Sequence, residues 1–238
     1  MGYVDGFVVP VPESNREAYR RHAEAAAPVF RRGGMTRFLE CWGDDVPEGK
    51  RTDFRRAVQA VPGEQVLFSW IEFPDRATRD ASHRITMESP EAEAMMRDMP
   101  FDGKRMIWAG FEVVSDAGPG GTAGYVDGMV APAPSDGRGA FAAAAGRMAP
   151  LFLGAGATRV VDCWGDVVPE GKVTDFQRAV AAGADETAVY SWIEWPSKAV
   201  RDAGWAQLMA GGAMPGPDEM PFCPQRMIHG GFAPIVQV

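Results

Sequence analysis

The chain has 238 residues, of which 46% are hydrophobic and 24% are charged, a composition typical of a globular protein and not of a disordered one. Its 32 acidic and 24 basic residues give a formal net charge of −8. Because nucleic acids and anionic membrane surfaces repel such a charge, and the sequence has no offsetting cluster of Lys and Arg, we expect neither as a partner.

Hydrophobic periodicity predicts the elements of the first half of the chain in order. They are a strand over 3–11, a helix over 15–32, a strand over 35–46, a short helix over 54–60, a strand over 65–73, an interrupted helix over 75–97 and a strand over 104–114. Asp53 is expected to cap the short helix. The order of the main elements, βαββαβ, is that of a ferredoxin-like split βαβ unit.

The second half of the chain repeats the first, so the chain is a tandem duplication. The segments CWGDDVPEGKRTDFRRAV (41–58) and CWGDVVPEGKVTDFQRAV (163–180) are identical at 15 of 18 positions. A Gly-rich linker over 115–124 separates the two copies, 1–114 and 125–238. Because a ferredoxin-like sheet has helices on one face only, two copies can cover each other's bare faces. We therefore predict an α+β fold in which two tandem units pair their sheets as an intramolecular barrel.

Neither a targeting segment nor a disulfide is expected. The first residues have no basic segment and carry Asp5 within an apolar run, unlike a signal peptide, and no run of 18 apolar residues exists. Three cysteines cannot all pair, and none belongs to a CxxC motif. Reduced thiols in a cytoplasmic protein are the simplest interpretation.

Strand alternation groups aromatic and acidic residues on single faces. The groups in the first copy are Tyr3, Asp5 and Phe7; Phe38, Glu40, Trp42 and Asp44; and Phe68, Trp70 and Glu72. The pattern assigns Cys41 to the opposite, helix-facing side. A plain core does not hold several unpaired acids, whereas a partly polar pocket does. We therefore predict a ligand pocket between the sheets. The alternative is that these acids form salt bridges with Arg105, Arg226, Lys50 or Lys172 and only join the halves.

Four motifs of the chain resemble a known family. The segments YVDGFVVPVP, ECWGDDVPEGKRTDF, FSWIEFPDRATRDA and MPFDGKRMIWAGF are similar to the bacterial YbaA-like family of domains of unknown function, which belongs to the dimeric α/β-barrel superfamily. The resemblance covers nearly the whole chain, twice over, and implies an eight-stranded barrel with helices outside. It brings no catalytic residues. The wider superfamily includes cofactor-free monooxygenases, isomerases, haem-degrading enzymes and ligand-sensing modules.

The candidate catalytic residues are Glu72, Glu194 and His229. Apolar surroundings would raise the pKa of either glutamate toward that of a useful general base; salt bridging to Arg105 or Arg226 is the alternative. His229 takes the place of Trp108 in the first copy and could relay a proton, or it could be an ordinary strand histidine.

The candidate substrate-binding residues are Trp42, Asp44, Trp70, Arg105, Trp164, Asp166, Trp192 and Arg226. The tryptophans would stack on a planar ligand or pack between the halves, and the arginines would clamp an anionic group. The three histidines are far apart in sequence and form no metal-binding motif. We expect no metal and no cofactor; a haem held by a single histidine is the alternative left open.

These observations favour a cofactor-independent enzyme that acts on a planar small molecule by proton transfer, isomerisation or oxygenation. Two alternatives remain, a non-catalytic binding or sensing module for small molecules and a structural interaction protein. We expect a monomer with pseudo-twofold symmetry or a homodimer.

Overall fold

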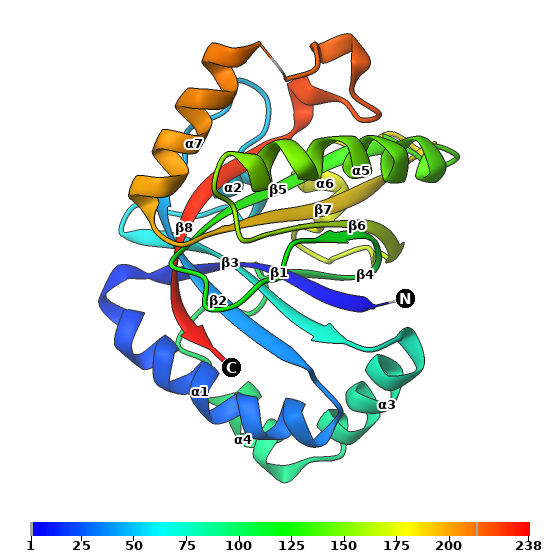
Figure 1. Ribbon diagram of the computed structural model, residues 1–238. Helices are drawn as coiled ribbons and strands as arrows, with labels where there is room; N and C mark the ends of the chain where they lie inside the picture. The colour runs from blue at the N-terminus through cyan, green and yellow to red at the C-terminus, as the bar shows by residue number, and fades with distance from the viewer. Residues whose placement is uncertain (1, 213) are drawn as a thin grey trace.

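A computed structural model describes residues 2–212 and 214–238. Eight strands form a closed antiparallel barrel in the order β1-β3-β2-β8-β5-β7-β6-β4. Two groups of helices lie on opposite sides of it (Figure 1). This architecture confirms the predicted α+β fold of two tandem ferredoxin-like units.

The two repeats contain the same strands and α-helices apart from α4, and they differ in their short 3-10 helices, Glu13–Asn15 in the first and Pro217–Glu219 and Pro224–Arg226 in the second. The first consists of β1 (Tyr3–Pro12), α1 (Arg16–Arg32), β2 (Arg37–Asp45), α2 (Phe54–Ala57), β3 (Glu64–Phe73), α3 (Arg76–Met87), α4 (Pro90–Arg97) and β4 (Ile107–Ala117). The second consists of β5 (Tyr125–Pro134), α5 (Arg138–Gly154), β6 (Arg159–Val167), α6 (Phe176–Ala179), β7 (Glu186–Trp195), α7 (Lys198–Gly211) and β8 (Ile228–Gln237). The expected cap is present: Asp53 accepts a hydrogen bond from a backbone amide of α2. Asp175 caps α6 in the same way.

Pairing between the repeats closes the barrel. Each repeat forms four neighbouring strands, and β2 then pairs with β8 while β4 pairs with β6. β4 continues to Ala117, into the expected linker, because its last residues pair with β6. Among the strands of the described residues no edge is left open, so each half depends on the other to satisfy its backbone hydrogen bonds.

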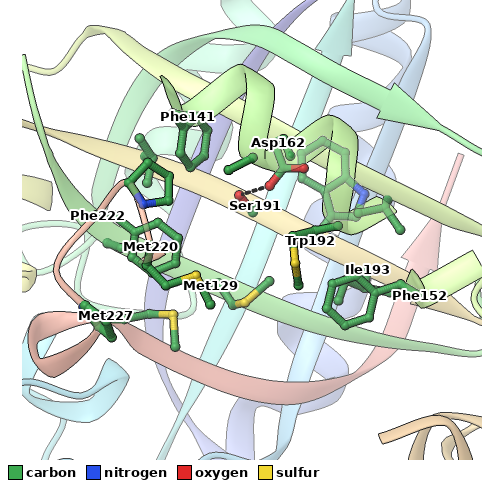
Figure 2. Close-up of a pocket in the computed structure, with 18 of the residues that line it drawn as sticks. Met129, Phe141, Phe152, Asp162, Ser191, Trp192, Ile193, Met220, Phe222 and Met227 are labelled. Carbon is green, nitrogen blue, oxygen red and sulfur yellow. Dashed lines mark hydrogen bonds between the residues drawn. The ribbon is translucent and has the colours of Figure 1, made fainter. Parts of the chain in front are cut away.

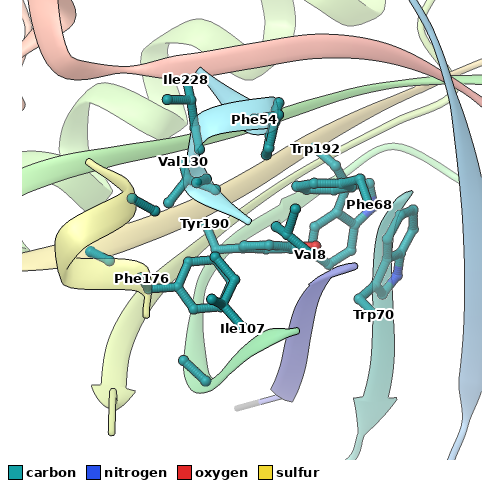
Figure 3. Packing of buried hydrophobic residues seen from close by; sticks show 14 of the residues in the cluster. Val8, Phe54, Phe68, Trp70, Ile107, Val130, Phe176, Tyr190, Trp192 and Ile228 are labelled. Atoms are coloured by element: carbon teal, nitrogen blue, oxygen red, sulfur yellow. The ribbon is translucent and has the colours of Figure 1, made fainter. Parts of the chain in front are cut away.

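Aromatic side chains from both repeats fill the inside of the barrel (Figure 3). Phe68 stacks on Tyr190 with ring centroids 4.5 Å apart, and Trp70 stacks on Trp192 at 4.4 Å. These are pairs of equivalent residues, so they lie on the pseudo-twofold axis. The Tyr190 hydroxyl donates a 2.9 Å hydrogen bond to the backbone carbonyl of Ser69 across the barrel.

Glycines in the repeated YVDG motif permit this packing. A Cβ at Gly6 would lie 2.9 Å from the Tyr190 ring, and a Cβ at Gly128 would lie 2.8 Å from the Phe68 ring. Both distances are too short for a Cβ atom. Close contact with the aromatic stack therefore explains the glycine of the YVDG motif in each repeat.

Helices cover the outer face of the sheet and bury it as well. In the first repeat Tyr3, Trp42, Leu67 and Ile71 pack beneath the helices, while Val4, Leu39, Cys41, Phe68 and Trp70 face the barrel interior. The expectation that the aromatic and acidic groups of the three strands share one face is therefore wrong. Cys41 lies inside the barrel, not under the helices. No helix in the described ranges is long and apolar enough to cross a membrane.

Candidate functional site

Glu72 and Glu194 lie at one end of the barrel, each paired with an arginine from the other repeat. Arg159 donates two hydrogen bonds of 2.8 Å to the carboxylate of Glu72. Arg37 binds both carboxylate oxygens of Glu194, with Nη2 2.8 Å from Oε2. The Glu194 side chain is fully buried, and that of Glu72 is 13% exposed. This geometry agrees with the alternative in which the acids join the halves, although the partners are not the arginines we expected.

Packed side chains occupy the place of the expected pocket between the sheets. Trp70 and Trp192 stack there, and their indole N–H groups donate to Glu72 and Glu194 at 2.9 and 3.0 Å. Two cavities, of about 270 and 460 Å³, open at the barrel end, and Glu72 and Arg159 line both of them. The prediction of a pocket around the stacked tryptophans is therefore wrong for Trp70, whereas Trp192 and Glu72 do line a cavity at the barrel end.

Arg105 and Arg226 lie at the opposite end of β3 and β7 from these acids. Each forms two hydrogen bonds, of 2.7 to 2.8 Å, to the first glutamate of its strand, Glu64 or Glu186. Arg105 also binds Asp102, and Arg226 binds the Cys223 sulfur that replaces this aspartate. Neither arginine reaches Glu72 or Glu194, so the structure does not bring these candidate residues together.

The remaining candidates lie on the outer face. Trp42 packs beneath α1 and Trp164 against Phe141 of α5. Asp44 and Asp166 accept 2.8 Å hydrogen bonds from Tyr125 and Tyr3 of the other repeat, which pin the halves together. His229 occupies an exposed position on β8, opposite Met129 of β5.

Two equivalent cavities lie elsewhere, between the helices and the outer face of the sheet. The cavity of the first repeat, called the Glu40 cavity here, has a volume of about 190 Å³. Its apolar lining comes from the sheet, from α1 and α4, and from the segment before β4: Phe7, Val9, Ala23, Ala26, Phe30, Phe38, Ile71, Ala92, Met95, Met96, Met99, Phe101 and Met106. The polar residues at its wall are Tyr19, His22, Glu40 and Thr86. Apolar walls with a few polar groups are typical of small-molecule sites.

Glu40 points into this cavity because it alternates with Leu39 and Cys41, which face the barrel interior. Its Oε2 accepts a 2.7 Å hydrogen bond from the Tyr19 hydroxyl of α1 and another from the Ser69 hydroxyl, directly opposite on β3. Oε1 has no hydrogen-bond partner among the described residues and is not one of the fully buried unpaired atoms. This oxygen is therefore available to a ligand.

Burial changes the acid–base properties of the cavity residues. It raises the pKa of Glu40 from 4.5 to about 7, although the Ser69 and Tyr19 hydrogen bonds act in the opposite direction. Burial also lowers the pKa of His22, because it disfavours the charged imidazolium. Glu40 thus exchanges a proton close to neutral pH, as a general base must.

The equivalent cavity of the second repeat, called the Asp162 cavity here, measures about 150 Å³ (Figure 2). The Ser191 hydroxyl donates a 2.7 Å hydrogen bond to Oδ1 of Asp162. Burial raises the pKa of Asp162 from 3.8 to about 6. Phe141 and Ala144 stand where the first repeat has Tyr19 and His22.

Glu40 and Asp162 are not among the candidate site residues of the sequence analysis, although the sequence carries a signal for them. Each is an acid within an otherwise apolar strand segment, FLECW (38–42) or VVDCW (160–164), in both copies. The signal available in the sequence was an acidic residue at the same position of both repeats, with apolar residues on both sides of it. Within the described residues, no group of three or more His, Cys, Asp or Glu side chains is arranged to hold a metal ion.

Comparison with known proteins agrees with this architecture. The uncharacterized protein YbaA of Escherichia coli K12 is 53% identical to this chain over 116 residues, which cover 49% of this chain and 99% of YbaA. YbaA of Shigella flexneri gives the same figures. These relatives therefore have the length of one repeat.

Solved structures with the same fold are distant in sequence. A proposed monooxygenase from Lactobacillus acidophilus NCFM has a TM-score of 0.58 at 9% identity, covering 100% of this chain and 95% of its own. An anthrone oxidase-like protein has a TM-score of 0.56 at 11% identity, covering 100% and 92%. Both share the dimeric α/β-barrel fold. The profile of the family described as protein of unknown function (DUF1428) matches residues 2–103 and again residues 124–224, so the chain belongs to this family and contains two copies of its domain.

Proposed function

We propose that the protein is a small-molecule enzyme in which Glu40 accepts a proton from a substrate bound in the Glu40 cavity. The observation that carries this proposal is a single carboxyl group, with a pKa of about 7, facing a mainly apolar cavity. A carboxylate in such surroundings is a stronger base than one in water. Glu72 and Glu194 do not enter the proposal because Arg159 and Arg37 occupy the oxygens of both side chains.

The cavity limits the size and polarity of the substrate. An apolar protein cavity of about 150 Å³ can bind benzene, so the Glu40 cavity, at about 190 Å³, fits a substituted single ring. Four methionines line it, and their flexible side chains can adapt to substituents. We therefore propose a planar, mainly apolar substrate of one-ring size with a weakly acidic C–H group.

Proton transfer follows from the arrangement of Glu40. Tyr19 and Ser69 fix Oε2, which leaves Oε1 to take the substrate proton while the electron pair of the broken C–H bond stays on the substrate. Returning the proton to another carbon isomerises the substrate. Alternatively, the carbanion reacts with dioxygen, and a CH₂ group plus O₂ becomes a carbonyl group plus water. In this proposal His22, which lies at the cavity wall and whose pKa is lowered by burial, exchanges protons with solvent.

The test uses 3-cyclohexenone, whose isomerisation to 2-cyclohexenone is followed by ultraviolet absorbance. Carbon-bound deuterium is measured in D₂O with and without dioxygen, together with a panel of one-ring enolisable ketones. We expect Glu40→Gln to lower the rate by roughly 10² or more. Asp162→Asn, the equivalent change in the second repeat, is the control and should leave the rate nearly unchanged.

Binding of these ketones without any exchange above the buffer rate would contradict the proposal and would favour a binding module instead. Equal loss of rate in the two variants would contradict the assignment of catalysis to Glu40.

A further inference from the structure

We propose that the Asp162 cavity is a second, non-catalytic binding site for a neutral, apolar molecule of one-ring size that carries one hydrogen-bond donor, such as a phenol. This assignment goes beyond the proposed function, because it concerns the other repeat and does not depend on turnover.

The lining of this cavity is more apolar than that of its counterpart. Its walls combine methionine, phenylalanine, alanine and branched side chains from β5, α5, β6, β7 and the segment before β8. Figure 2 shows Phe141 and Phe222 near one end and Phe152 with Ile193 near the other. The volume of about 150 Å³ equals that of an apolar cavity known to accept benzene. The shape and lining therefore favour a single flat ring.

Asp162 supplies the one directional contact. Ser191 occupies Oδ1, while Oδ2 has no hydrogen-bond partner among the described residues and is not a fully buried unpaired atom. An ionised carboxylate only accepts hydrogen bonds, so the ligand must present an O–H or N–H donor. A cation would lose its hydration for a single buried partner, which costs more than burying a neutral hydroxyl group. These features favour a phenol over an amine or a plain hydrocarbon.

The second repeat lacks the groups that would support turnover. Phe141 cannot donate the hydrogen bond that Tyr19 gives to Glu40, and Ala144 cannot exchange protons as His22 can. Trp205 lines the cavity, but its indole N–H is engaged by Asp127 at 2.7 Å. The Asp162 cavity therefore keeps a carboxylate for recognition and lacks the counterparts of Tyr19 and His22.

The methionines make the two cavities separately observable by NMR of methyl-labelled protein. Met129, Met148, Met214, Met220 and Met227 line the Asp162 cavity, and Met95, Met96, Met99 and Met106 line the Glu40 cavity. Titration compares phenol with toluene, which has a similar shape and no donor, and with benzylamine. We expect phenol to shift the first set of resonances with an affinity roughly tenfold or more above those of toluene and benzylamine, since a hydrogen bond to a charged group is worth about 1.5–3 kcal/mol.

Variants of Asp162 separate the hydrogen bond to phenol from apolar binding in the same cavity. Asp162→Leu should bring phenol to the affinity of toluene, with the Glu40-cavity resonances unchanged as the sign of an intact fold. If that variant does not fold, Asp162→Asn should still weaken phenol binding and spare toluene. Glu40→Gln, which should strongly lower the rate of turnover, is expected to leave phenol binding at the Asp162 cavity intact.

Three results would overturn the assignment: equal wild-type affinities for phenol and toluene, no response of the Asp162-cavity methyl groups, or turnover that Asp162→Asn removes and Glu40→Gln spares. The first two results leave the proposed function of Glu40 untouched. A Glu40→Gln enzyme with full activity contradicts that function alone when Asp162→Asn is also fully active, and it contradicts both proposals when Asp162→Asn is inactive.

Discussion

At the scale of single residues, the molecule is distinguished by one acid in each repeat, Glu40 and Asp162, placed between a sheet and its helices. Each is ionised less readily in the folded state than in the unfolded chain, because burial raises its pKa. Between pH 4.5 and 7 the folded protein therefore holds more protons at Glu40 than the unfolded chain does. Stability from this group is lost as the pH rises through that window.

This difference predicts the pH dependence of unfolding. The wild-type free energy of unfolding should fall relative to that of Glu40→Gln between pH 4.5 and 7, by up to about 1.4 kcal/mol per pH unit. Urea unfolding of both proteins at several pH values measures it. A difference that stays constant across this range would show that Glu40 keeps its ordinary pKa in the folded state.

Tyr19 gives a second prediction at this scale. Its hydrogen bond lowers the pKa of Glu40, so Tyr19→Phe should raise that pKa further and move the rising limb of the pH–rate profile to higher pH. The second repeat already has phenylalanine there, at position 141, so the substitution is sterically acceptable. Phe141→Tyr is the matched control and should leave the profile unchanged; an unshifted profile in Tyr19→Phe would contradict the role of this hydrogen bond.

At the scale of elements, strand positions were predictable and the relative orientation of strands was not. The alternation within β3 is correct, since Phe68 and Trp70 share the interior face. β1 and β2 have both faces buried, one in the barrel and one under helices. Because most residues on both faces of these strands are buried, the sequence pattern does not show which face points into the barrel. The grouping of Trp42 and Asp44 with Trp70 is wrong for this reason.

The crossed ion pairs at the barrel end give a prediction for the contact between repeats. Arg37→Ala should cost about 3 kcal/mol of stability, because Glu194 would lose its bidentate partner while fully buried. Combining it with Glu194→Gln should cost clearly less than the sum of the single changes. A double-mutant cycle by urea unfolding measures this coupling, and additive single effects would mean that the pair contributes nothing specific. Arg159→Ala should cost less, since Glu72 is partly exposed.

At the scale of the whole molecule, the duplication predicted the barrel, because two sheets with bare faces must cover each other. The location of the cavities did not follow from it. They depend on how far α1, α4, α5 and α7 lie from the sheet, which is set by side-chain packing across many residues distant in sequence.

The closed barrel also predicts how separated halves behave. A chain of residues 2–117 exposes its interior aromatic face and the unpaired edges of β2 and β4, so it should self-associate as a dimer. Mixed with residues 124–238, it should form a one-to-one assembly. Size-exclusion chromatography with light scattering measures both states, and a stable, folded monomer of either half would contradict this reading of the barrel.

The stacked Phe68–Tyr190 pair has a consequence for how the protein could evolve. In an assembly of two identical chains, a residue on the symmetry axis always meets its own copy, and every mutation there arrives twice. Joining the copies into one gene removes that restriction. Here phenylalanine faces tyrosine, and a single hydroxyl crosses to Ser69, an arrangement that identical subunits cannot encode. In a fused chain the two copies can therefore change independently, including at the residues of their contact on the pseudo-twofold axis.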